Sequence, residues 1–134
     1  MIECAFFVDH SWAQLIVSGK KIWELRSTRT RIIDEEVGII ATGSGAVIAT
    51  CKIADCIGPL SDRELAETEH YHRTTAEVRV RPKGSAPWRY AWKLADVRSL
   101  RQPVPYDHPW GAQGWVKIGP AVAEHVRRQL AAQR

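Results

Sequence analysis

The stretch "SGKKIWELRS", residues 18–27, places two lysines, a glutamate and an arginine around one tryptophan, directly after a glycine. Its "KIWELR" portion alternates, which predicts a strand that sends Trp23 and Leu25 to one face. Glu24 and Arg26 then share the opposite face. A hydrophobic core does not require charges of both signs here, so the stretch is a candidate ligand-binding segment.

The residues before this stretch predict a strand followed by a short helix. "CAFFV" (4–8) is short, apolar and rich in aromatic residues, as strands are. "SWAQLIVSG" (11–19) has apolar residues at helical spacing, with Ser11 as the expected N-cap and Gly19 where a helix-ending glycine belongs. Lys21 is therefore expected at the start of the charged strand, just after the helix ends.

The rest of the chain predicts short strands with a few inserted helices. "GSG" (43–45) between two β-rich runs indicates a hairpin. Ser61 and Glu64 stand at capping-box spacing and predict a surface helix over 61–71. The other expected elements are strands over 37–42, 46–58 and 88–94, a segment compatible with a strand at 77–81, an ordered loop over 101–115, a last strand from residue 115 and a terminal helix from Pro120.

These elements predict an α+β fold, a small and mostly antiparallel β-barrel with two or three short helices. At 134 residues, a single domain over 1–134 is expected. No apolar run is long enough to span a bilayer, so no membrane partner is expected. The N-terminal residues lack a basic leader, and the expected location is cytoplasmic.

Composition limits the chemistry that the chain can carry out. The net charge of +4 permits a polyanionic partner without requiring one. The three cysteines form no CxxC pair and are expected to be small buried hydrophobes, and no cofactor is expected. "EHYH" (69–72) is interpreted as a solvated helix end rather than a metal site, so no metal is expected. Six tryptophans are more than a core of this size needs, and an indole at a rim can stack on a base.

Three stretches together resemble an ASCH domain, a branch of the PUA-like barrel superfamily. The first, 11–27, resembles the opening helix of the family followed by a Gly-x-Lys-x-x-Glu-x-Arg signature. Gly19, Lys21, Glu24 and Arg26 match that signature. The second, "RYAWKLADVRSLRQPVPY", resembles the aromatic strand and Pro-x-Pro turn of the family, and the third, "HPWGAQGWVKI", its glycine-containing loop and closing strand.

This resemblance implies a cleft lined by the signature strand and the glycine loop, and a role in binding RNA or a modified nucleobase. Lys21, Glu24 and Arg26 are the residues expected to read the ligand. The other expected nucleic-acid contacts are Lys20, Arg29 and Arg31 with phosphates, stacking by Trp110, and cleft-lining roles for His108 and Trp12.

The charged residues have a ligand-binding and a structural interpretation. A carboxylate flanked by cations is placed to accept hydrogen bonds from a base, and arginine offers a planar fork for a phosphate or a carbonyl edge. Alternatively, Glu24 and Arg26 form a salt bridge that closes the barrel mouth, while Lys20 and Lys21 are solvated. The sequence leaves both open.

Two further functions remain alternatives to binding alone. Some relatives in the family hydrolyse a nucleoside or RNA, and the chain would then use Lys21 and Glu24. In relatives that remove an acetyl group from 4-acetylcytidine, a threonine nucleophile stands three residues after the lysine, where this chain has Glu24. Glu24 would instead act as a general base on water, with Lys21 stabilising negative charge. The third interpretation is an adaptor whose basic face meets a protein partner.

Overall fold

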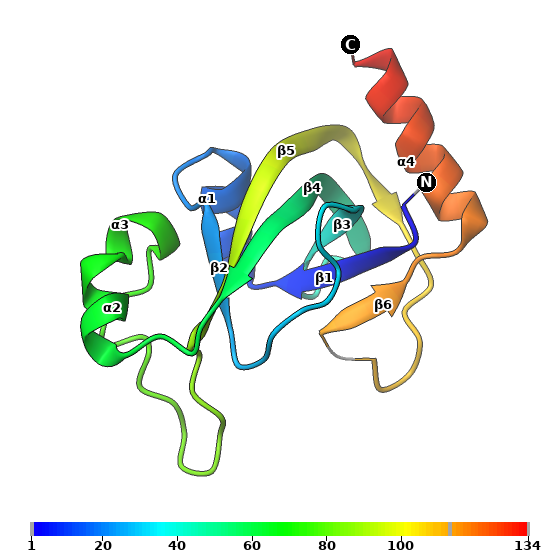
Figure 1. Ribbon diagram of the computed structural model, residues 1–134. Helices are drawn as coiled ribbons and strands as arrows, with labels where there is room; N and C mark the ends of the chain where they lie inside the picture. The colour runs from blue at the N-terminus through cyan, green and yellow to red at the C-terminus, as the bar shows by residue number, and fades with distance from the viewer. Residues whose placement is uncertain (1, 113, 134) are drawn as a thin grey trace.

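A computed structural model describes residues 2–112 and 114–133 (Figure 1). Within them the fold is α+β, a curled six-stranded mixed sheet that forms a half-barrel and carries four short helices. The strands are β1 (Cys4–Val8), β2 (Trp23–Arg26), β3 (Glu36–Ala41), β4 (Ala46–Ile57), β5 (Tyr90–Pro105) and β6 (Trp115–Lys117). The helices are α1 (His10–Val17), α2 (Asp62–Glu67), α3 (Glu69–His72) and α4 (Pro120–Ala132).

The sheet has the order β2-β5-β4-β3-β1-β6. β1 and β3 run parallel, and the four other neighbouring pairs are antiparallel. β4 and β5 are 12 and 16 residues long, and their pairing shifts register at three places. Such shifts bend strands, and β5 arches across the molecule from beside β2 towards α4 (Figure 1). The curl brings β2 close to β1, although three strands separate them in the sheet order.

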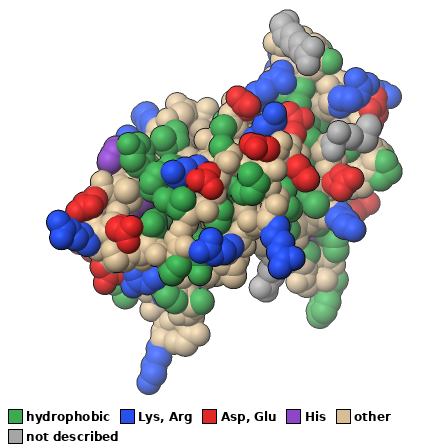
Figure 2. Space-filling model, in the orientation of Figure 1, with side chains coloured by type: hydrophobic (Ala, Val, Ile, Leu, Met, Phe, Trp, Pro, Cys, Tyr) green, Lys and Arg blue, Asp and Glu red, His purple; other side chains and the backbone are tan. Residues whose placement is uncertain are grey.

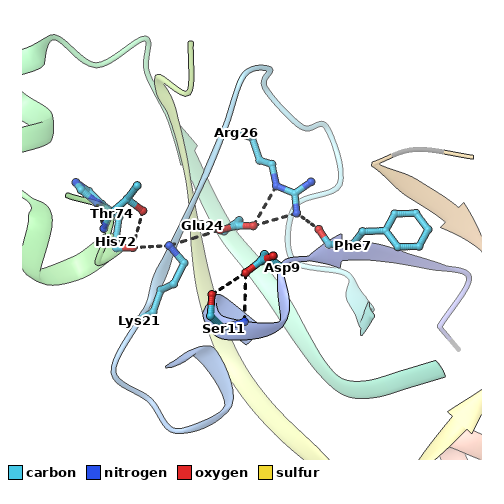
Figure 3. A network of polar contacts seen from close by, with 8 residues as sticks. All are labelled: Phe7, Asp9, Ser11, Lys21, Glu24, Arg26, His72 and Thr74. Carbon is cyan, nitrogen blue, oxygen red and sulfur yellow. Dashed lines mark hydrogen bonds and ion pairs between the residues drawn. The ribbon is translucent and has the colours of Figure 1, made fainter. Parts of the chain in front are cut away.

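β2 alternates as its sequence predicts. Leu25 is buried, and Trp23 packs beside it, in a small apolar cluster that includes Leu60 and Leu65. Glu24 and Arg26 face the other way, towards β1 and α1 (Figure 3). The strand therefore separates a hydrophobic face from a charged face.

The helix before β2 begins earlier than the sequence predicts. Asp9, not Ser11, is the N-cap: its Oδ2 accepts hydrogen bonds from the Ser11 backbone N–H, at 3.3 Å, and from the Ser11 hydroxyl, at 2.6 Å. A carboxylate caps a helix as well as a hydroxyl does and is also favoured by the helix dipole. Gly19 follows the helix with a φ of +82°, where glycine is unstrained.

The predicted helix over 61–71 is present but divided. α2 has the expected capping box between Ser61 and Glu64. α3 follows it directly, which gives one helix more than expected. Residues 77–81 are not a strand: residues 76–79 form a turn, in which Arg79 N donates to the Thr75 carbonyl at 3.0 Å. The Arg79 side chain also donates to the Thr74 carbonyl, at 2.6 Å.

The predicted loop over 101–115 is a strand in its first part, because β5 continues to Pro105. Two glutamines at the C-terminal end of α4, Gln129 in the helix and Gln133 at its C-cap, replace the missing strand partner. Gln133 Oε1 accepts from the Arg101 backbone N–H at 3.0 Å, and Gln129 Oε1 accepts from that of Gln102 at 3.1 Å. Their amide nitrogens each donate to a β5 carbonyl at 2.9 Å. The backbone is thus satisfied where β4 does not pair with it.

Of the cysteines, Cys51 is buried as expected, whereas Cys4 and Cys56 are only partly buried. Burial raises the pKa of Cys51 to about 12, which makes its thiol unreactive. Across residues 2–112 and 114–133, no helix combines the length and the apolar composition that crossing a membrane requires. In the same part of the chain, no three His, Cys, Asp or Glu residues gather as a metal ion would need.

Candidate functional site

Lys21 and Glu24 are both buried, with 1% and 3% of their surface exposed. The turn after α1 sends Lys21 inward, because its backbone N–H bonds to the Leu15 carbonyl at 3.0 Å. Lys21 Nζ lies 3.5 Å from Glu24 Oε1 and donates to the backbone carbonyl of His72 (Figure 3). It also lies 5.2 Å from the centre of the Trp12 ring. Lys21, which was expected to contact either a ligand or solvent, is an internal residue.

Arg26 holds the other oxygen of Glu24 and joins two strands. Its Nη2 and Nε lie 3.0 and 3.2 Å from Glu24 Oε2. Nη2 also donates to the backbone carbonyl of Phe7, in β1. The guanidinium lies 5.1 Å from the ring centre of Trp92 and 5.5 Å from that of Phe6. This planar group therefore ties β2 to β1 across the mouth of the half-barrel.

The electrostatics of Lys21 follow from its burial. Loss of solvation lowers its pKa from the ordinary value of 10.5, although the neighbouring Glu24 carboxylate opposes that shift. The structure offers the ammonium two acceptors, Glu24 Oε1 and the His72 carbonyl. Glu24 in turn lies between two cations, which compensate for its own burial.

His72 is fully buried, which corrects the interpretation of 69–72 as a solvated helix end. Its Nε2 lies 2.8 Å from the Leu65 carbonyl, and its Nδ1 accepts from the Thr74 backbone N–H at 3.0 Å. These partners fit a neutral ring with its proton on Nε2. Burial lowers the pKa of His72, which also favours the neutral ring. The hydrogen bonds of the His72 ring thus hold this residue in place, and its backbone carbonyl accepts from Lys21 Nζ.

A hollow of about 220 Å³ opens beside these charges. We call it the signature hollow. It is lined by Phe7, Val8, Asp9, Trp12, Glu24, Leu25, Arg26 and Trp88. Lys21 is not among the lining residues, so it contacts Glu24 from within the protein rather than from the hollow. The hollow therefore presents a carboxylate and a guanidinium on one wall and indole rings on another.

A comparison with models of known families shows which family the chain belongs to. The family model described as ASCH domain matches residues 7–104. The chain belongs to the ASCH domain family. A search among curated proteins finds no match.

Solved structures give the same fold for this ASCH domain. The crystal structure of ASCH from Zymomonas mobilis superposes with a TM-score of 0.73 at 18% identity, covering 97% of this chain and 94% of the other. A serine-to-alanine variant of the Z. mobilis protein gives 0.74 at 18% identity, covering 94% of each chain. A tyrosine-to-phenylalanine variant gives 0.71 at 18% identity, covering 96% of this chain and 98% of the other. At this identity the likeness establishes the fold alone.

The other predicted contacts of the ASCH domain are spread around this hollow. Trp12 lines it, as expected. Lys20, Arg29 and Arg31 are exposed. Arg29 donates to the Gly58 carbonyl at 2.5 Å, which occupies part of its guanidinium. Phosphate binding by these residues remains a prediction.

Trp110 and His108 do not line the signature hollow. Trp110 is 100% exposed, and His108 lines a separate cavity of about 540 Å³. We call this the aromatic cavity. Phe7 lines both spaces, so they adjoin, and the expected single cleft consists of two parts. The lining residues of the aromatic cavity are Phe7, Thr42, Gly43, Gly45, Tyr106, His108, Ala112 and Gly114.

Sequence reasoning missed several contributors to the site. The Phe7 and His72 carbonyls are backbone groups that any residue carries, so no sequence signal marks them. Trp88 was assigned to a strand, yet it lines the signature hollow and lies 5.4 Å from Trp12, edge to face. Arg81, which the sequence places at the end of a segment compatible with a strand, lies 4.1 Å from the Trp88 ring centre. The turn at 76–79 precedes Arg81 in the loop that brings it there.

Proposed function

We propose that this ASCH domain binds RNA by taking one unpaired base, plain or modified, into the signature hollow. The observation that carries the proposal is the pairing of Glu24 and Arg26 on one wall with Trp12 and Trp88 close by. A nucleobase is flat and carries donors and acceptors along its edge. It needs a carboxylate or carbonyl, a donor and an apolar surface from the protein.

The charges are held in place before a ligand arrives. Glu24 is anchored by Lys21 and Arg26, and Arg26 is anchored by the Phe7 carbonyl. Arg26 Nη1 has no hydrogen-bond partner among residues 2–112 and 114–133, and Figure 3 draws it without a dashed line. This nitrogen is the donor that we assign to the base. Preorganised groups lose little entropy on binding.

The size of the hollow and the surrounding charges suit one base of a single strand. A volume of about 220 Å³ is smaller than the cavities of drug-sized ligands. Lys and Arg are interspersed with Asp and Glu over the face in Figure 2, so that face has no continuous basic stripe. A protein that binds mainly through phosphates would need such a stripe. Arg81, beside Trp88, and Arg29 are the basic residues that we assign to flanking phosphates.

The hydrolase alternative is less well supported. The Lys21 side chain is fully buried and has Glu24 and a backbone carbonyl as partners, so it does not reach a bound substrate. Of these two residues, Glu24 lines the hollow and Lys21 does not. Incubation with 4-acetylcytidine and with short RNA separates the two functions: binding without product supports the binding module, whereas turnover lost in Lys21→Ala supports the enzyme.

The test of the proposal is equilibrium binding of short single-stranded RNA, followed by polarisation of a fluorescent label. Arg26→Lys removes the Nη1 donor and should weaken binding about tenfold, since a hydrogen bond from a charged donor is worth ~1.5–3 kcal/mol. Arg63→Lys is the matched control, because Arg63 forms an exposed pair with Glu67 on α2. Equal losses in both variants, or no binding by the wild-type protein, would contradict the proposal.

The ionic-strength dependence adds a second criterion. If two or three phosphates are contacted, affinity should fall about tenfold for a roughly fourfold rise in salt. A base held in the hollow should keep measurable binding at high salt, because buried contacts are screened less. Free nucleosides, which have no phosphate, should compete at any salt concentration.

A further inference from the structure

The aromatic cavity is built from three segments that are far apart in the chain. The turn at 43–45 and the end of β5 are joined by the hydrogen bond from Tyr106 N to the Gly45 carbonyl, at 3.2 Å. The Gly114 carbonyl accepts from Phe7 N at 3.1 Å and adds the glycine loop. The cavity, about 540 Å³ in volume, is therefore held in shape by hydrogen bonds between these segments. Its volume falls within the range of ligand pockets.

Aromatic rings form the walls. His108 lies edge to face with Phe7 at 5.4 Å and with Tyr106 at 5.9 Å. Three glycines and the small side chains of Thr42 and Ala112 line the rest of the cavity. Such walls admit a flat ring against aromatic faces, with little to tell one base from another.

A small polar group lies among these rings. The Tyr106 hydroxyl lies 2.9 Å from His108 Nδ1. Burial raises the pKa of Tyr106, so the hydroxyl keeps its proton. When it donates to Nδ1, His108 carries its own proton on Nε2. That nitrogen is an N–H donor for a base edge.

Phe7 places this cavity next to the signature hollow. Its backbone carbonyl accepts from Arg26, and Phe7 is a lining residue of both spaces. Successive bases of a single strand can enter neighbouring pockets when the nucleic-acid backbone passes over the residue that the pockets share. Resting on the function proposed above, we infer that the aromatic cavity is a second base subsite, which takes the nucleotide next to the one held by Glu24 and Arg26.

The test compares ligands that differ by one base. The four ribonucleoside monophosphates, the sixteen dinucleotides and dinucleotides whose second unit lacks a base are titrated into the full chain by calorimetry. The best dinucleotide should bind about tenfold more tightly than its partner without the second base, since stacking of one base on aromatic side chains contributes that much. The two ligands carry the same phosphates, so charge does not explain the difference.

Two variants of the aromatic cavity test whether the second base binds there. Ala112→Phe fills the space, and His108→Ala removes a wall and the donor. His108 is exposed, so its loss should not unfold the protein. Both variants should reduce the advantage of the second base to threefold or less, while monophosphate affinity stays unchanged. Arg127→Ala, on the exposed face of α4, is the control and should behave like the wild-type protein.

The outcomes separate the two proposals. If monophosphates bind in a way that Arg26→Lys weakens, but the second base adds nothing, the subsite is wrong and the signature hollow stands. If the advantage persists in both cavity variants, the second base binds elsewhere and the subsite is likewise wrong. If no nucleotide or RNA binds at all, both proposals fail.

Discussion

Lys21 Nζ lies 3.5 Å from Glu24 Oε1, and both residues are buried, with 1% and 3% of their surface exposed. The charged residues of the signature are therefore not simply solvated, and they are not all open to a ligand. Lys21 supports Glu24, Glu24 faces the hollow, and Arg26 holds both Glu24 and the Phe7 carbonyl. Within the same motif, Lys21 has a structural role, whereas Glu24 and Arg26 are the residues that we propose to contact the ligand.

Replacing Lys21 should show how strongly the stability of the fold depends on its contact with Glu24. Lys21→Met leaves the buried Glu24 with one cation and the His72 carbonyl without its donor, so the free energy of unfolding should fall by about 3 kcal/mol. Lys20→Met is the matched control: its side chain is exposed, and the change should stay within about 0.5 kcal/mol. Urea unfolding followed by tryptophan fluorescence measures both. Equal stabilities of the two variants would show that the buried pair is not stabilising.

Acid should destabilise the fold through His72. The pKa of His72 is lowered by burial, so in the folded state the ring stays neutral while the unfolded chain takes up a proton. Stability should therefore be lost as pH falls below the ordinary value of 6.5, and should level off below the folded pKa. Protonation would also break the bond from Thr74 N to Nδ1. The measurement is the free energy of unfolding from pH 7.5 to 5.

Two histidine variants identify the residue responsible. His72→Gln should flatten the pH dependence, whereas His125→Gln, at an exposed position of α4, should leave it intact. Should His72→Gln fail to fold, the NMR titration of the wild-type His72 ring decides instead. A ring that titrates at 6.5 or above would contradict the prediction.

Gly58 should not tolerate a side chain. Its φ is +136°, and an added Cβ would lie 2.6 Å from the Arg89 carbonyl and 2.8 Å from the Tyr90 ring. Gly58→Ala should lower stability by about 3 kcal/mol, since both backbone strain and a clash with main-chain atoms arise. Gly84→Ala is the control that introduces backbone strain without a clash, because Gly84 has a φ of +88° and open space around it. Its cost should be about 1 kcal/mol, and a similar cost at both sites would rule out the clash.

Trp110 offers a test that leaves the fold undisturbed. It is 100% exposed and lies between His108 and Ala112, two residues that line the aromatic cavity. If its indole stacks on RNA, Trp110→Ala should weaken binding of a short single strand about threefold to tenfold. The melting temperature should not change. Unaltered affinity would mean that this indole does not contact RNA.

The alternation of "KIWELR", the capping box at Ser61 and the order of motifs were sufficient to predict the fold and the charged face of β2. The burial of Lys21 could not be predicted, because its partner is a backbone carbonyl 51 residues away in the chain. The length of β5 was missed for a similar reason. Prolines in that segment indicate a loop, and only the distant glutamines of α4 provide the missing hydrogen bonds.

Gln129 and Gln133 give α4 a role that the family boundaries do not include. The match to the family ends at residue 104, yet the amides of Arg101 and Gln102, inside the match, depend on a helix outside it. A protein trimmed to the matched residues would carry an open stretch of strand edge on β5, the kind of surface on which chains pair with one another and precipitate. The smallest piece that keeps this edge of β5 covered should therefore extend through Gln133.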